Sequence, residues 1–281
     1  MKLCRFGAPG AEMPALVDRD GRLRDLSGVR PDIGPRELSP EGLAALAAID
    51  PATLPLVEGE PRLGVPFAGM SKFICIGLNY SDHAAEAGMA VPSEPIIFLK
   101  APSALSGPDD PIIQPPHSTR LDWEVELGVV IGTTARYVDE DDALAYVAGY
   151  CVVNDVSERA FQMQSSQWDK GKGCDTFGPV GPFLVTKDEV PDPQDLDMRL
   201  DVNGRRMQSG NTRTMIFGVR ELIAYCSRYM TLLPGDIIAT GTPPGVGMGM
   251  KPEPVWLRPG DVVELEIAGL GRQRQEITAH R

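Results

Sequence analysis

The chain has 281 residues, of which 42% are hydrophobic, and its 39 acidic residues outnumber 27 Lys and Arg residues to give a formal net charge of −12. That acidic balance argues against a nucleic-acid partner, and the longest apolar runs are too short to span a bilayer. Five cysteines without a C-x-x-C pair indicate reduced thiols, and the first residues contain no apolar leader, so we expect a cytoplasmic protein.

Residues 1–70 are predicted to form a small N-terminal α/β domain. Two short strands are expected there, Lys2–Phe6 and Ala15–Val17. A short helix is predicted to begin at Pro40 with Ser39 as its N-cap, because serine and then proline favour these two positions. Closely spaced prolines follow this helix and are typical of a linker, which places the boundary near Met70 and a catalytic domain at 71–281.

The second domain is predicted to be rich in strands. They are expected at Phe73–Ile76, Ile96–Leu99, Glu124–Ile131, Gly149–Val153, Gly181–Val185, Met198–Val202, Asp236–Ala239 and Val262–Ile267. Helical periodicity appears mainly at His83–Ala87, Glu140–Ala148 and Met215–Met230. This excess of strands argues against an open parallel sheet and predicts an α+β fold, mainly β, with folded-over antiparallel sheets.

Several common catalytic motifs are absent from the sequence. It contains no G-x-S-x-G turn, no H-E-x-x-H helix and no Walker loop ending in G-K-[ST]. The glycine-rich segment 241–250 lacks the G-x-G-x-x-G spacing, and Pro252 and Pro254 forbid the helix that should follow a phosphate-binding loop. With only three histidines, a His-rich zinc site is not expected either. After these exclusions, chemistry based on carboxylate side chains is the remaining possibility.

The most informative segment is LDWEVELG at 121–128. In a strand Glu124 and Glu126 share a face, where two carboxylates repel each other and a divalent cation would relieve the repulsion. A solvent-facing strand is the alternative reading, and VELEI at 263–267 repeats the pattern on what we expect to be such a surface. Asp155 ends an apolar strand abruptly, and three carboxylates with waters would suit Mg²⁺ or Mn²⁺.

Two other segments carry groups that could act on a substrate. In GLNYSDHAAE, His83 and Glu86 stand three residues apart on one face of a predicted helix, and a histidine oriented by a carboxylate can serve as a general base. An incidental pair on a surface helix is the alternative. The glycine-rich loop 169–179 carries Lys170 and Lys172, either of which could meet an anionic substrate or simply face solvent.

Seven ordered segments over roughly residues 70–275 resemble the fumarylacetoacetate hydrolase family. They are GLNYSDHAAE, EPIIFLKAPSAL, LDWEVELGVVIG, GYCVVNDVSERAFQ, KGKGCDTFGPVGP, NTRTMIFGV and LLPGDIIATGTPPGVG. Within the family, the stretch from Gln167 to Gln194 and the later GLGRQRQ are most similar to the bacterial sugar-acid branch. That branch resembles the 2,4-diketo-3-deoxy-rhamnonate and -fuconate hydrolases and is often labelled ureidoglycolate lyase.

The resemblance implies a mixed β-roll with peripheral helices, a homodimer and a divalent metal, Mg²⁺ or Mn²⁺. By position in the family's motifs, the implied site residues are Glu124, Glu126 and Asp155 as metal ligands, His83 and Glu86 as a dyad on a lid helix over roughly residues 80–92, Lys172 as the active-site lysine, Arg159 and Gln162 as polar pocket residues, and Thr242 as a substrate contact. One departure is Leu78, which stands where several relatives carry a basic residue.

The implied substrate is a small 2-oxo acid. We expect hydrolysis of the C3–C4 bond of a 2,4-dioxo sugar acid to pyruvate and a hydroxy acid, lactate if the substrate is the deoxy-rhamnonate or -fuconate diketo acid. Ureidoglycolate lyase, oxaloacetate decarboxylase or hydratase activity on the same scaffold remains open, with Leu78, Gln167 and Trp168 among the residues that decide. A non-enzymatic binding protein is a remote alternative, because the ligand triad, dyad and lysine are intact.

Overall fold

Short strands make up most of the regular structure in this computed structural model, which describes residues 1–82 and 91–280. The strands are β1 (Lys2–Phe6), β2 (Met13–Val17), β3 (Leu23–Asp25), β4 (Phe73–Gly77), β5 (Ile96–Lys100), β6 (Leu105–Ser106), β7 (Ile112–Gln114), β8 (Leu121–Asp122), β9 (Val125–Ile131), β10 (Val147–Asn154), β11 (Ser157–Glu158), β12 (Gly178–Thr186), β13 (Asp197–Val202), β14 (Arg205–Asn211), β15 (Ile237–Ala239), β16 (Val262–Ile267) and β17 (Gly271–Ala279). The α-helices are α1 (Pro40–Ala47), α3 (Arg159–Gln162), α4 (Asp169–Lys172) and α5 (Val219–Tyr229), and the 3₁₀ helices are η1 (Pro51–Thr53), η2 (Pro102–Ala104), η3 (Glu140–Tyr146), η4 (Lys187–Glu189), η5 (Thr212–Thr214) and η6 (Gly247–Gly249).

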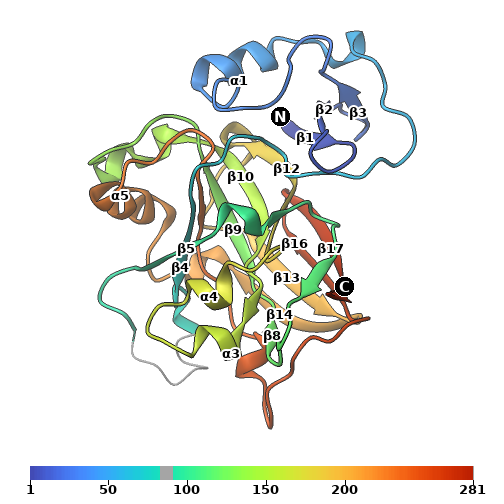
Figure 1. The fold of residues 1–281 in the computed structure, drawn as a ribbon. Coiled ribbons are helices and arrows are strands. Elements are labelled where there is room, and N and C mark those ends of the chain that lie inside the picture. Colours follow the sequence, from blue (N-terminus) through green and yellow to red (C-terminus); the bar gives the residue numbers. More distant parts are fainter. Residues whose placement is uncertain (83–90, 281) are drawn as a thin grey trace.

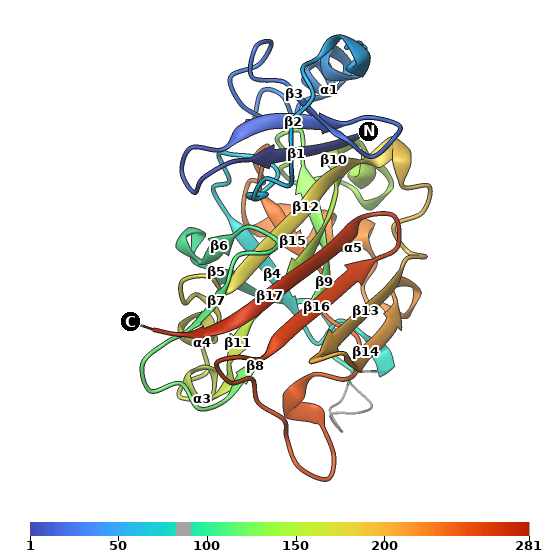
Figure 2. The same cartoon turned by 90° about the vertical axis from the view of Figure 1, so that its right-hand side faces the viewer.

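Two large sheets form the frame of the molecule. The first has the order β3-β2-β1-β12-β10-β9-β15-β4-β5, with β6 added to β12, and the second has the order β14-β13-β16-β17-β7. Figure 2 shows β17 of the second sheet beside β12 of the first, with β16 on the far side of β17. The side chain of Gln273 in β17 joins the two sheets, because its amide donates to the carbonyls of Val152 (2.8 Å) and Gly181 (2.9 Å). The mainly β, α+β prediction is confirmed.

Strand β9 is buried on both faces and divides the core into two clusters. Its odd-numbered residues, such as Leu127 and Val129, pack in the cluster between the two sheets. Val130 points the other way and packs with residues of the N-terminal segment. Because strand side chains alternate, Glu126 shares the face of Val130 rather than that of Leu127. The Glu126 carboxylate is thereby placed in the interior of the protein.

The N-terminal segment extends the ten-stranded sheet. β1 pairs antiparallel with β12, with Leu3 opposite Leu184, and Leu3 is fully buried in the cluster that contains Val130. Figure 1 shows β1–β3 and α1 together at one end of the molecule. The sheet therefore crosses the boundary proposed near Met70, and the division into two domains stays a prediction.

Local helix signals located α1 and α5 but not all helix ends. The helix predicted at Met215–Met230 is α5, which begins only at Val219 and ends at Tyr229. α1 begins at Pro40, and the Ser39 hydroxyl accepts a hydrogen bond from the Gly42 N–H (3.0 Å), as predicted. The helix expected over 140–148 was wrong at its end: the 3₁₀ helix stops at Tyr146, because Val147 already pairs with β9. The expected helix at 83–87 lies outside the described residues. None of the described helices combines the length and apolar character needed to cross a membrane.

Candidate active site

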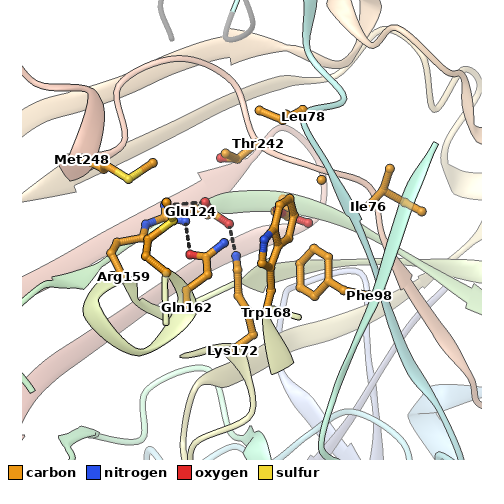
Figure 3. Close-up of a pocket in the computed structure, with 13 residues that line it drawn as sticks. Ile76, Leu78, Phe98, Glu124, Arg159, Gln162, Trp168, Lys172, Thr242 and Met248 are labelled. Atoms are coloured by element: carbon orange, nitrogen blue, oxygen red, sulfur yellow. Dashed lines mark hydrogen bonds and ion pairs between the residues drawn. The ribbon is translucent and has the colours of Figure 1, made fainter. Parts of the chain in front are cut away.

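A cavity of about 230 Å³ opens where β4, β5, the start of β9, the short helices α3 and α4 and the turn before η6 meet (Figure 3). Its polar lining consists of Glu124, Glu126, Arg159, Gln162, Lys172 and Thr242. Every one of these was predicted as a site residue from the sequence. The rest of the described lining is apolar or glycine: Ile76, Gly77, Leu78, Phe98, Met163, Trp168 and Met248.

Three carboxylates converge beside this cavity. Oxygens of Glu124, Glu126 and Asp155 all lie within 4.8 Å of one another, and the three residues are buried. The central strand pair sets their spacing: Glu126 stands opposite Val153 in the β9–β10 ladder, and the Asp155 N–H donates to the Glu124 carbonyl (3.0 Å). Glu124 lies in the break between β8 and β9 rather than within a strand, so strand alternation alone does not explain why the two glutamates meet.

Lys172 lies between two of these carboxylates. Its Nζ donates to Glu124 Oε2 and to Asp155 Oδ2, both at 2.7 Å, and its side chain is 3% exposed. The neighbouring Lys170 is exposed and bonds Gln164 (2.7 Å). The structure thus separates the two lysines that the sequence left equivalent.

Arg159 fixes the other side of Glu124. Its Nη2 donates to Glu124 Oε1 (2.5 Å), its Nε to Asp122 Oδ2 (2.9 Å) and its Nη1 to Gln162 Oε1 (3.1 Å). Asp122 also accepts the N–H groups of Gly247 (2.6 Å) and Met248 (3.0 Å). This carboxylate therefore ties helix α3 to the glycine-rich turn and holds Arg159 against Glu124.

Sequence reasoning missed Asp122 and Lys100 as members of the site. Lys100 ends β5, is fully buried, and donates to Asp155 Oδ1 and to the Val156 carbonyl (3.0 Å). One oxygen of Asp155 is thereby committed to Lys100, on the side away from Lys172. Lys100 ends an apolar strand, and this pattern could have revealed it. Asp155 was predicted from the same kind of pattern, because it directly follows the apolar strand β10.

Thr242 occupies a fixed position in the turn. Its hydroxyl donates to the Val125 carbonyl and accepts from the Gln208 side-chain amide, both at 2.8 Å. The hydroxyl proton is thus used by the backbone of β9, the oxygen accepts from Gln208, and Thr242 is held at the cavity lining.

The donor set fits a divalent cation. Four buried carboxylates (Asp122, Glu124, Glu126, Asp155) meet three buried cations (Lys100, Arg159, Lys172) in the described part of the chain, so negative charge is in excess. Glu126 bears that excess: its described partner is the Gly241 N–H (2.9 Å), and burial together with the charges of Asp155 and Glu124 raises its pKa. By contrast, the Arg159 and Lys172 charges hold the pKa of Glu124 well below its usual range despite its burial. All-oxygen ligation of this kind suits Mg²⁺ or Mn²⁺.

The repeated acidic pattern at 263–267 behaves as the predicted surface. Glu264 pairs with Arg272, and Glu266 pairs with Arg199 (2.7 Å), on a solvent-facing side of β16. The predicted dyad, His83 and Glu86, and most of the predicted lid lie outside the described residues.

Known proteins resemble this chain in sequence and in fold. A family model described as fumarylacetoacetate (FAA) hydrolase C-terminal matches residues 72–278. A protein of Sphingomonas sp. named 2,4-didehydro-3-deoxy-L-rhamnonate hydrolase is 60% identical over 282 residues, which cover 100% of this chain and 97% of that protein. The structure of fumarylacetoacetate hydrolase from Exiguobacterium antarcticum matches with a TM-score of 0.87 at 37% identity, covering 100% of both chains. A maleylpyruvate hydrolase of Sphingobium sp., solved with manganese(II) ion and pyruvate, matches with a TM-score of 0.84 at 32% identity, again over 100% of both chains.

Proposed function

This chain belongs to the fumarylacetoacetate hydrolase family, and we propose that it hydrolyses the C3–C4 bond of a 2,4-dioxo sugar acid to pyruvate and a hydroxy acid. The resemblance predicted from its motifs is confirmed, and the chain is an enzyme. The proposed substrate is 2,4-didehydro-3-deoxy-L-rhamnonate, the compound that appears in the name of the Sphingomonas relative. Lactate is the expected second product.

The observation that carries the proposal is the convergence of Glu124, Glu126 and Asp155 with Lys172 in one buried site. A 2-oxo acid presents a carboxylate and an adjacent carbonyl oxygen, and this site presents cationic donors beside an all-carboxylate ligand set. A divalent cation held by the three carboxylates would supply Lewis-acid stabilisation for charge that develops at the 2-oxo end. Mg²⁺ and Mn²⁺ both fit the ligand set.

The remaining roles belong to side chains of this protein. Lys172 would support the substrate carboxylate through its ammonium, and Arg159 keeps Glu124 ionised and oriented. We propose that His83, oriented by Glu86, takes a proton from a water whose oxygen attacks C4. The C3–C4 bond then breaks, its electron pair moves to C3, and a proton added at C3 makes the methyl group of pyruvate. The C4 fragment leaves as the carboxylate of the hydroxy acid.

The decisive experiment is a substrate comparison with the chelator-treated and the metal-reconstituted protein. We expect equal amounts of pyruvate and lactate from 2,4-didehydro-3-deoxy-L-rhamnonate, restored by Mg²⁺ or Mn²⁺. Full activity after exhaustive chelation would refute the requirement for a metal ion. Turnover of ureidoglycolate without pyruvate from any 2,4-dioxo acid would favour the lyase, and turnover of oxaloacetate alone would favour the decarboxylase.

A further inference from the structure

The lining of the cavity combines charged and apolar side chains. Its acidic and cationic groups belong to the cluster around Glu124, whereas Leu78, Phe98, Met163, Trp168 and Met248 supply an apolar side. In Figure 3 dashed contacts join Glu124, Arg159, Gln162 and Lys172. The apolar side chains flank this cluster: Met248 lies near Arg159, while Trp168 and Phe98 lie beside Lys172, whose Nζ is 5.0 Å from the centre of the Phe98 ring.

The aromatic part of the apolar side is rigid. Trp168 meets Phe98 edge to face, with ring centroids 5.4 Å apart. A Cβ at Gly77 would come within 2.5 Å of the indole ring, so the glycine backbone and the indole are in direct contact. Trp168 therefore packs against Gly77 of β4 and Phe98 of β5, and these contacts oppose its displacement by a substrate tail.

The rim of the apolar side is softer. Met163 and Met248 are 67% and 43% exposed while they line the cavity. The Met248 N–H is anchored on Asp122 (3.0 Å), but its unbranched thioether can follow tails of different length. Exposed methionines at a cavity mouth thus favour apolar contact without demanding one shape.

The two cations of the described lining are already bonded to protein carboxylates, and the one proposed to support the 2-oxo carboxylate, Lys172, is engaged at that end, so neither remains for a second carboxylate. Arg159 is bonded to Asp122 and Glu124, and Lys172 is bonded to Glu124 and Asp155. A charged group buried among apolar side chains without a partner is costly, whereas a methyl group there is favourable.

We propose that Leu78, Met163, Trp168 and Met248 determine specificity by admitting 2-oxo acids whose far end is uncharged and excluding those that end in a second carboxylate. The inference rests on the proposed function, because it takes the 2-oxo carboxylate to bind on the polar side. The methyl end of a deoxy sugar acid meets this requirement, and a dicarboxylic acylpyruvate does not.

A matched pair of unreactive probes tests the selection separately from catalysis. 2-Oxoheptanoate and 2-oxoheptanedioate have the same chain length and lack the C4 carbonyl, so neither can be hydrolysed by attack at that position. Calorimetry with the Mg²⁺-loaded protein should give an affinity for the monoacid roughly 100-fold higher than for the diacid. Met248→Lys places an ammonium at the rim and should reduce that ratio at least about tenfold by strengthening diacid binding.

Met13→Lys is the control, because Met13 is similarly exposed (40%) and lies in β2, outside the cavity lining. It should leave the ratio unchanged. Equal affinities in the unmodified protein, no binding of either probe, or an equal response to both substitutions would overturn the inference. Hydrolysis of 2,4-dioxoheptanoate, followed by pyruvate release in the same preparations, tests the proposed function independently.

Discussion

At the scale of single residues, the site is governed by charge balance. Glu124 and Asp155 each bond two cationic groups, whereas Glu126 accepts a backbone N–H among its described contacts. Similar side chains therefore differ in charge balance: Glu124 and Asp155 are already compensated by cations, whereas Glu126 is the carboxylate that a metal ion would compensate most. The following substitutions separate these roles.

The substitution Glu126→Gln removes the negative charge of the side chain and keeps its volume. We expect Mn²⁺ affinity, measured by calorimetry, to fall by at least about 100-fold, and activity to fall with it. The chelated protein should retain its melting temperature, because the lost carboxylate was repelled by Asp155 and Glu124. Glu264→Gln, on the solvent-facing side of β16, is the control and should bind Mn²⁺ normally. A normal Mn²⁺ affinity in Glu126→Gln would remove Glu126 from the ligand set.

Lys100 is expected to act as a positioning residue. Lys100→Met releases the Asp155 oxygen that Lys100 holds, so Mn²⁺ affinity should fall about 10–100-fold. The chelated protein should also lose about 3 kcal/mol in urea unfolding, because a buried carboxylate loses a partner. Lys170→Met, at an exposed lysine, should change neither quantity. A folded Lys100→Met protein with normal Mn²⁺ affinity would show that Asp155 needs no such support.

His83 is expected to matter more for hydrolysis than for decarboxylation. Hydrolysis needs an activated water at C4, and loss of a general base costs about 10²–10⁴-fold. We therefore expect His83→Ala to lose that much pyruvate release from 2,4-didehydro-3-deoxy-L-rhamnonate and to retain more of any oxaloacetate decarboxylation. The comparison is made at equal metal saturation. An equal loss on both substrates would remove the water-activating role from His83.

At the scale of elements, two very short helices place two of the three buried cations described for the site. α3 carries Arg159 and Gln162, α4 carries Lys172, and Gly171 lets them pack together. A Cβ at Gly171 would approach the Gln162 nitrogen to 2.4 Å and the Glu158 carbonyl oxygen to 2.6 Å, and neither backbone atom can yield cheaply. The position of Lys172 is therefore set by the residue before it.

Gly171→Ala should separate α3 from α4 and draw Lys172 away from Glu124. We expect kcat/KM to fall about 100-fold, as misplacement of a reacting group by about an ångström does, with a stability loss of about 1–3 kcal/mol. Gly28→Ala, where a new Cβ meets nothing within 4 Å, should be neutral. Steady-state kinetics and thermal melting decide, and an active Gly171→Ala enzyme would contradict the packing argument.

The elements also show what local sequence can predict. Ser39 and Pro40 identified α1 because a helix start depends on adjacent residues. Glu124, Glu126 and Asp155 were predicted because acidic residues within or directly beside apolar runs of sequence are conspicuous. Lys100 was missed because its carboxylate partner is 55 positions away. Likewise the end of the helix predicted at 140–148 was decided by pairing with β9, which no local pattern reveals.

At the scale of the whole molecule, the N-terminal segment and the rest share a sheet and a core. Leu3 and Leu184 face each other across β1 and β12, and both belong to one buried cluster with Val130. All three tryptophans of the sequence, Trp123, Trp168 and Trp256, lie beyond residue 70. Tryptophan fluorescence therefore reports on the second part of the chain alone.

Leu3→Ala tests whether the two parts unfold together. We expect a single urea transition whose tryptophan-detected midpoint falls, with a loss of about 2–5 kcal/mol for a fully buried leucine. Leu56→Ala, at a 40% exposed leucine, should have little effect. A midpoint that ignores Leu3→Ala would show that the N-terminal segment unfolds on its own.

The carboxylates lie on and beside the paired central strands β9 and β10, while Leu78, Met163 and Met248 lie outside strands, in connecting segments. The spacing of the carboxylates and the proposed selection of the substrate tail therefore depend on different parts of the backbone. Substitutions that change the specificity for the substrate tail can accumulate in the connecting segments without altering the distances among the carboxylates. Laboratory selection for new acylpyruvates should consequently enrich changes at the rim first, with the acidic cluster left intact.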